Sequence, residues 1–161
     1  MKKTVLALSL FITSWASHAQ VIETLSSYGQ LAQKASQEIN TGSFDQINQS
    51  STQLVELAKK ILPAFSKNNP KCVDYLNTVM AAADSMQSLT LEQIEADYHL
   101  DGKLPTLTSG DCYHAKDLLV HPATVVVMSK TLADNKENRR QMAHELTEVI
   151  QHLGLVKNAV Q

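Results

Sequence analysis

The fold is decided by residues 43–65, whose sequence is SFDQINQSSTQLVELAKKILPAF. The apolar and small residues of this stretch recur at alternating steps of three and four, the spacing of one face of an α-helix. Ser43 is suited to cap the N-terminus of this helix, and Pro63 is expected to kink or end it near its C-terminus. The stripe consists of Phe44, Ile47, Ser51, Leu54, Ala58, Ile61 and Phe65.

The same spacing predicts a helix immediately upstream, over residues 21–39. Gly42 is suited to the left-handed position that follows a helix end. Because only Thr41, Gly42 and Ser43 connect the two predicted helices, we expect them to lie antiparallel as a hairpin.

Downstream of residue 65 the pattern predicts further helices over residues 72–86, 111–133 and 136–153, the last of them stopped by Gly154. Thr90 and Gln93 form a capping-box pattern for a short helical segment that ends near residue 98. Pro122 is expected to kink the helix over residues 111–133, and residues 99–110 form one long irregular loop. The sequence therefore predicts an all-α, up-and-down four-helix-bundle-like domain with a kinked fourth helix.

The N-terminus has the pattern of a secretory signal peptide. Lys2 and Lys3 precede an apolar run over residues 5–16, and Ser17 and Ala19 place small residues at the cleavage positions. The apolar run is about 12 residues long, whereas a membrane-spanning helix needs about 20. We therefore expect residues 1–19 to be removed, residues 20–161 to form a single periplasmic or secreted domain, and no transmembrane segment to remain.

The chain has two cysteines, Cys72 and Cys112. In an exported protein an even number of cysteines indicates a disulfide bond, so we expect these two to be paired. The alternative is two free thiols, of which one serves as a metal ligand.

Charge and motifs exclude several function classes. Removal of Lys2 and Lys3 from the 14 basic residues leaves 12 against 16 acidic ones, and nucleic acid is therefore not an expected partner. No complete catalytic motif is present, so no catalytic residue is predicted. The segment His144-Glu145-Leu146-Thr147-Glu148 lacks the second histidine of a zinc-protease motif, and its helical positions predict that His144 and Glu148 face solvent.

Residues 97–121 have the most unusual composition, because they include three of the six histidines of the chain, His99, His114 and His121. At 100° per residue, His114 and His121 lie on the apolar stripe of their helix and should point towards the core. Seven positions along a helix rise about 10.5 Å, so one ion could not easily be held by both. The three alternatives are hydrogen-bonded core histidines that tie down the loop, a metal site, and a site for haem or another ligand.

From these patterns we expect an exported, non-enzymatic helical-bundle protein that binds a partner protein or a small ligand. The alternative is a metal- or haem-binding protein that uses His114 or His121 with His99 and Asp101, and a small enzyme is the third possibility. No cofactor is predicted outright, a transition metal and b-type haem remain open, and the oligomeric state is not predicted. The candidate ligand-binding residues are Tyr98, His99, Asp101, Tyr113, His114 and His121.

Overall fold

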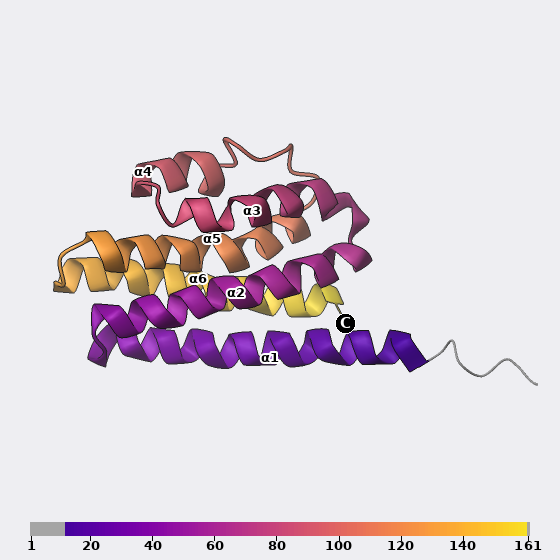
Figure 1. The fold of residues 1–161 in the computed structure, drawn as a ribbon, viewed down its shortest axis with the longest axis horizontal. Helices are drawn as coiled ribbons and strands as arrows, with labels where there is room; N and C mark the ends of the chain where they lie inside the picture. Colours follow the sequence, from indigo (N-terminus) through magenta and orange to yellow (C-terminus); the bar gives the residue numbers. More distant parts are fainter. Residues whose placement is uncertain (1–11, 161) are drawn as a thin grey trace, which may run out of the picture.

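The computed structural model describes residues 12–160, and describes side chains from Gln20 onwards. All regular elements in this part of the chain are helical, which confirms the predicted all-α fold (Figure 1). The elements are α1 (Ile12–Thr41), α2 (Phe44–Asn68), the 3₁₀ turn η1 (Pro70–Cys72), α3 (Val73–Met86), α4 (Leu91–Ile94), the π-helical turn η2 (Glu95–His99), α5 (Gly110–Thr131) and α6 (Lys136–Val160).

The four long helices form a closed ring in which α1 packs against α2 and α6, and α5 packs against the same two helices. Helix α3 lies against α2 and α5, and α4 with η2 covers a further part of α5 (Figure 1). Helix α5 is therefore surrounded, and every residue from 115 to 128 is buried. A helix that is buried on all sides has no single apolar stripe, and its polar residues lie inside the protein.

Pro122 lies within α5 without ending it. A proline has no N–H, so the carbonyl of Leu118, four residues earlier, loses its helical hydrogen bond. The hydroxyl of Tyr28 on α1 donates a hydrogen bond of 2.6 Å to this carbonyl. Burial raises the pKa of Tyr28, so the hydroxyl retains the proton that it donates.

The predicted caps and helix ends are partly confirmed. Ser43 and Thr90 each form a complete capping box, with Gln46 and Gln93 respectively. The left-handed position predicted for Gly42 is wrong, because no glycine in the described chain has a positive φ, and the Gly42 N–H continues the helical pattern by bonding the Glu38 carbonyl at 2.8 Å.

Pro63, which was expected to kink or end its helix, does not end it, and Gly154, which was expected to end the last helix, does not do so either. Helix α2 continues beyond Pro63 to Asn68, and α6 continues beyond Gly154 to Val160. In α6 the buried positions Leu153, Val156 and Val160 extend the apolar stripe past the glycine. Their packing outweighs the roughly 1 kcal/mol that a glycine costs inside a helix.

The predicted disulfide bond between Cys72 and Cys112 is present, and it joins η1 to the first turn of α5. The free-thiol alternative is thereby excluded. Most of the predicted signal peptide lies outside the described residues. No helix in the described part of the chain has both the length and the apolar character needed to cross a membrane.

Candidate functional site

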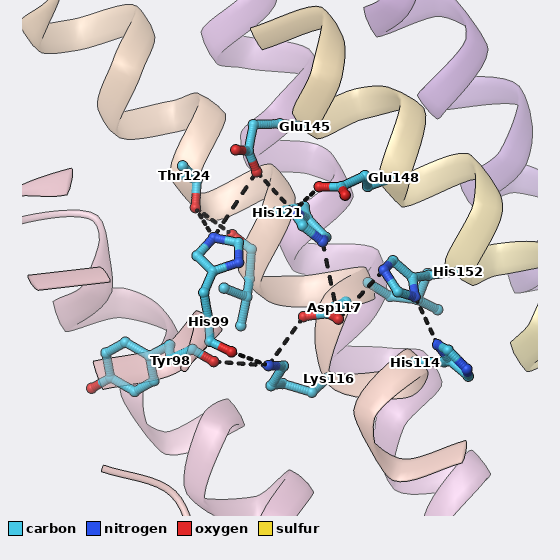
Figure 2. Close-up of polar contacts among 12 residues, drawn as sticks. Tyr98, His99, His114, Lys116, Asp117, His121, Thr124, Glu145, Glu148 and His152 are labelled. Atoms are coloured by element: carbon cyan, nitrogen blue, oxygen red, sulfur yellow. Dashed lines mark hydrogen bonds and ion pairs between the residues drawn. The ribbon is translucent and has the colours of Figure 1, made fainter. Parts of the chain in front are cut away.

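Four histidines, two of α5 and two of neighbouring elements, lie in a row along α5 (Figure 2). His99 ends η2, His114 and His121 are on α5, and His152 is on α6. The ring centroids are 4.8 Å apart for His99 and His121, 5.3 Å for His121 and His152, and 5.1 Å for His152 and His114. We call these four residues, together with Asp117, Glu145 and Glu148, the histidine cluster.

The cluster forms because α5 and α6 carry the same spacing in opposite directions. Asp117 precedes His121 by four residues on α5, and Glu148 precedes His152 by four residues on α6. Side chains four residues apart share one helix face. The carboxylate of each helix therefore faces an imidazole of the other, with 3.4 Å between Asp117 Oδ2 and His152 Nε2 and 3.6 Å between Glu148 Oε2 and His121 Nδ1.

The centre of the cluster contains buried polar atoms that have no hydrogen-bond partner. The Asp117 side chain is fully buried, yet neither carboxylate oxygen makes a hydrogen bond, and the same is true of His121 Nε2. Lys116 Nζ lies 3.3 Å from Asp117 Oδ1, but outside hydrogen-bonding geometry. A buried polar group without a partner costs about 1–3 kcal/mol, so these atoms mark a place where a ligand would be favourable.

Two of these atoms, Asp117 Oδ2 and His121 Nε2, could hold a metal ion together with His152 Nε2. Asp117 Oδ2 lies 4.0 Å from His121 Nε2 and 3.4 Å from His152 Nε2, and all three atoms lie within 4.8 Å of one another. In a tetrahedral zinc site with bonds of about 2.0–2.1 Å, ligand atoms lie about 3.3–3.4 Å apart. The distance between Asp117 and His152 already matches such a site, whereas that between Asp117 and His121 would have to shorten by about 0.6–0.7 Å. We call Asp117, His121 and His152 the inner group.

The second nitrogen of each imidazole in the inner group is already held by a neighbour. His121 Nδ1 hydrogen-bonds Glu145 Oε2 at 2.7 Å, and His152 Nδ1 hydrogen-bonds His114 Nδ1 at 2.9 Å. Metal-binding histidines nearly always use their outer nitrogen in this way, which fixes the ring and its tautomer. The contacts orient both Nε2 atoms towards Asp117.

The buried Lys116 anchors the loop that delivers His99. Its ammonium group donates to the carbonyls of Tyr98 and His99 at 2.8 and 3.2 Å and to Asp101 Oδ1 at 3.0 Å. Asp101 also accepts a hydrogen bond of 2.7 Å from Tyr75, and it adopts a φ of 61°, which a short polar side chain tolerates. These contacts fix the end of η2 against α5.

Burial controls the charge of the imidazoles. It lowers the pKa of His99 to about 4 and that of His152 to about 4, and the charge of His121 acts in the same direction on both. Burial also lowers the pKa of His121, but the hydrogen bond to Glu145 and the charge of Asp117 outweigh it, so the pKa is raised. His99 and His152 are therefore neutral at pH 7, the state in which imidazole binds metals.

A surface groove of about 450 Å³ opens beside the cluster, between α4, η2, α5 and α6. Its lining includes His99, Thr124 and Glu145, together with Glu92 and Glu95. The groove gives solvent access to the side of the cluster opposite Asp117, whose side chain is fully buried.

The structure brings together only some of the predicted site residues. His99 and His121 are in contact, whereas His114 joins the cluster through His152. The remaining candidates lie around Lys116: Tyr98 through its carbonyl, Asp101 through its carboxylate, and Tyr113 with its ring 4.5 Å from the ammonium group.

Sequence reasoning missed Lys116, Asp117, Glu145 and His152 as site residues. The repeated four-residue spacing from an acidic residue to a histidine, on two helices joined by a short connection, was the signal that could have found two of them. His144 is exposed, as predicted. The prediction that Glu148 faces solvent is wrong in part, because this half-buried carboxylate lies 3.6 Å from His121 as well as 3.4 Å from His144.

Comparison with protein-family models, with curated proteins and with solved structures gave no match. The functional argument therefore rests on the geometry of the histidine cluster.

The free energy of unfolding of the metal-free protein should fall as the pH drops from about 6.5 to about 4. In this range the unfolded chain protonates the imidazoles of His99 and His152, whose ordinary pKa is 6.5, while the folded chain, with pKa values of about 4, does not. Unfolding therefore takes up protons and becomes easier as the pH falls. We expect a loss on the order of 2 kcal/mol, after allowance for solvent screening at the partly exposed His152, in urea unfolding followed by circular dichroism.

The two other groups of the cluster whose pKa is shifted, His121 and Asp117, do not reverse this sign. The raised pKa of His121 acts above pH 6.5, because below it the ring is protonated in both states. The raised pKa of Asp117 acts in the opposite direction, but one carboxyl group opposes two imidazoles. His152→Gln should flatten the pH profile and the exposed His144→Gln should not, and equal profiles for the two variants would contradict the assignment.

Proposed function

We propose that this chain is an exported helical-bundle protein that binds a divalent transition metal of the zinc–copper class at Asp117, His121 and His152. The observation that carries the proposal is the buried Asp117 carboxylate, which has no hydrogen-bond partner and faces two imidazole nitrogens at 3.4 and 4.0 Å. A divalent cation between these three atoms would pair all of them at once.

The donor set favours this class of metal. Two imidazoles and one carboxylate are ligands that zinc and copper bind well, whereas calcium and magnesium prefer oxygen ligands alone. Three protein ligands leave a fourth position for water or for another ligand. The side chains of Asp117 and His121 are 0 and 5% exposed, so the ion would be shielded from competing water on most sides.

Metal binding has more support in the geometry than the other two binding roles expected from the sequence. Neither His114 nor His121 lines the groove beside the cluster, so neither is placed to ligate a haem bound there. A partner protein or small organic ligand remains compatible with the exposed groove, but the unpaired atoms lie beneath it. Export is supported by the signal pattern at residues 1–19 and by the Cys72–Cys112 disulfide bond.

The test is metal titration of protein without a histidine tag, by calorimetry and by elemental analysis after desalting. We expect Zn²⁺ or Cu²⁺ to bind, and a metal at about 100 times its Kd to raise the Tm by roughly 5–10 °C. Asp117→Asn and His152→Gln should abolish this shift. The matched variants Asp84→Asn and His144→Gln, which change exposed residues on α3 and α6, should retain it.

Two outcomes would reject the proposal. One is that neither Zn²⁺ nor Cu²⁺ binds in calorimetry or raises the Tm, even in large excess over the protein. The other is binding that survives both Asp117→Asn and His152→Gln, which would place the metal elsewhere in the chain.

A further inference from the structure

His121 presents its two ring nitrogens to two different sets of potential metal ligands. Its Nε2 faces Asp117 and His152 in the inner group, whereas its Nδ1 faces Glu145 Oε2 at 2.7 Å. His99 Nε2 lies 4.0 Å from the same Glu145 oxygen. His99, His121 and Glu145 each offer one ligand atom, and these atoms lie within 4.8 Å of one another; we call these three residues the outer group.

The two groups differ in their access to solvent. The side chains of Asp117 and His152 in the inner group are 0 and 12% exposed. His99 and Glu145 in the outer group are 15 and 20% exposed, and both line the groove described above. An ion in the outer group would therefore be reached from the groove, past the carboxylates of Glu92 and Glu95 on its wall.

The charges around the cluster leave room for more than one divalent ion. Four carboxylates lie in or beside the cluster: Asp101 and Asp117 pair with the ammonium group of Lys116, and Glu145 and Glu148 pair with His121. With the imidazoles neutral, the net charge is minus three, and one divalent ion leaves it at minus one. A second divalent ion, with release of the remaining ring proton of His121 to solvent, brings the cluster to zero.

We propose that the histidine cluster binds two divalent transition metals that are bridged by the imidazole ring of His121. This inference rests on the proposed function, because the first ion is the one in the inner group. The second ion is held by His99 Nε2, His121 Nδ1 and Glu145 Oε2, with Glu148 as a further carboxylate 3.6 Å from the same nitrogen.

The structure also predicts the order of binding. The outer ion replaces the hydrogen bond between His121 and Glu145, and it replaces the 3.0 Å hydrogen bond between His99 Nε2 and the hydroxyl of Thr124. The inner ion displaces no hydrogen bond of Asp117 Oδ2 or His121 Nε2, because these atoms have none, and the hydrogen bond of His152 to His114 is made by Nδ1, the nitrogen that the ion would not use. The inner group should therefore fill first and with the higher affinity.

The test is Cu²⁺ titration of the untagged full chain, with stoichiometry from native mass spectrometry and the metal environment from electron paramagnetic resonance. The first equivalent should give the full signal of an isolated Cu²⁺ ion. The second should reduce the total signal, because two Cu²⁺ ions that share one imidazole ring couple antiferromagnetically.

The variants separate the two groups. His99→Gln and Glu145→Gln should each reduce the stoichiometry from two to one and retain the signal of the isolated ion. His144→Gln, a matched change of an exposed histidine on the same groove, should keep two ions and the loss of signal. Thermal unfolding of each variant shows whether it folds. If the His99 and Glu145 variants lose the same single equivalent, the loss is due to the outer group and not to a side effect of one substitution.

Two results would overturn the bridge while leaving the proposed function intact. One is that the unaltered chain binds only a single equivalent of Cu²⁺ and that Asp117→Asn abolishes this binding. The other is that the chain binds two equivalents of Cu²⁺ with no loss of the electron paramagnetic resonance signal, and that His99→Gln changes neither the stoichiometry nor the signal. A chain that binds no Cu²⁺ and no Zn²⁺ would instead reject the proposed function, and the bridge with it.

Discussion

Replacement of Lys116 by methionine is expected to lower the free energy of unfolding by about 3–5 kcal/mol, although the two side chains have similar length. The lysine is fully buried, and it is the cation that faces both Asp101 and Asp117. Without it, the buried Asp117 carboxylate has no compensating charge, and the carbonyls of Tyr98 and His99 lose a donor. Removal of one partner from a buried ion pair is far more costly than the pair itself is stabilising.

The matched control is Lys59→Met on α2. Lys59 forms ion pairs with Glu56 and Asp84 at 3.1 Å, but all three side chains are exposed or half-exposed. Exposed pairs of this kind contribute about 0–1 kcal/mol, so this variant should be nearly as stable as the unaltered chain. Urea unfolding of both variants at pH 7 makes the comparison.

A second variant identifies the cause of the Lys116 effect. Addition of Asp117→Asn to Lys116→Met removes the uncompensated carboxylate and should restore part of the lost stability. If Lys116→Met and Lys59→Met proved equally mild, the account of Lys116 as the buried counter-ion of this cluster would fail.

Removal of the disulfide bond by Cys72→Ala and Cys112→Ala should cost about 4 kcal/mol on the chain-entropy model. The bond links residues that are 40 positions apart, and it fastens the first turn of α5, five residues before Asp117, to η1. The intervening segment includes the irregular loop over residues 100–109. Without the bond the unfolded chain gains the freedom of that whole segment.

Chemical denaturation with and without a reductant tests this prediction. The reductant should lower the stability of the unaltered chain to that of the double variant, and should leave the double variant unchanged. A loss below about 1 kcal/mol would contradict this account and would indicate that the unfolded chain keeps the segment restricted even without the bond.

Local sequence patterns predicted the parts of the fold that depend on near neighbours. The stripes of α1 and α2 were readable because each helix has one exposed side, and the capping boxes at Ser43 and Thr90 involve residues only three positions apart. The prediction that α6 ends at Gly154 is wrong because it considers only the local preference of glycine. The helix continues because Val156 and Val160 pack in the core, which is a tertiary effect.

The site was less predictable because its contacts cross between helices. The prediction that both histidines of α5 point towards the core is correct for His121, which is buried, and correct in part for His114, which is half-buried. However, α5 is enclosed on all sides, so Lys116 and Asp117 are buried although they lie off any apolar stripe. His152 is a site residue only because α6 runs antiparallel to α5, and the one sign of this in the sequence is the spacing of four from Glu148 to His152, which matches that from Asp117 to His121.

The closed ring of helices also determines when the protein can fold. Helix α1 packs against α6, so the first helix of the structure obtains its second neighbour only once the last helix has been made. Contacts between segments so distant in the sequence slow folding, because a long loop must close before they form. The N-terminal half of the bundle therefore cannot finish folding before the C-terminal half, because α1 needs α6 as its second neighbour.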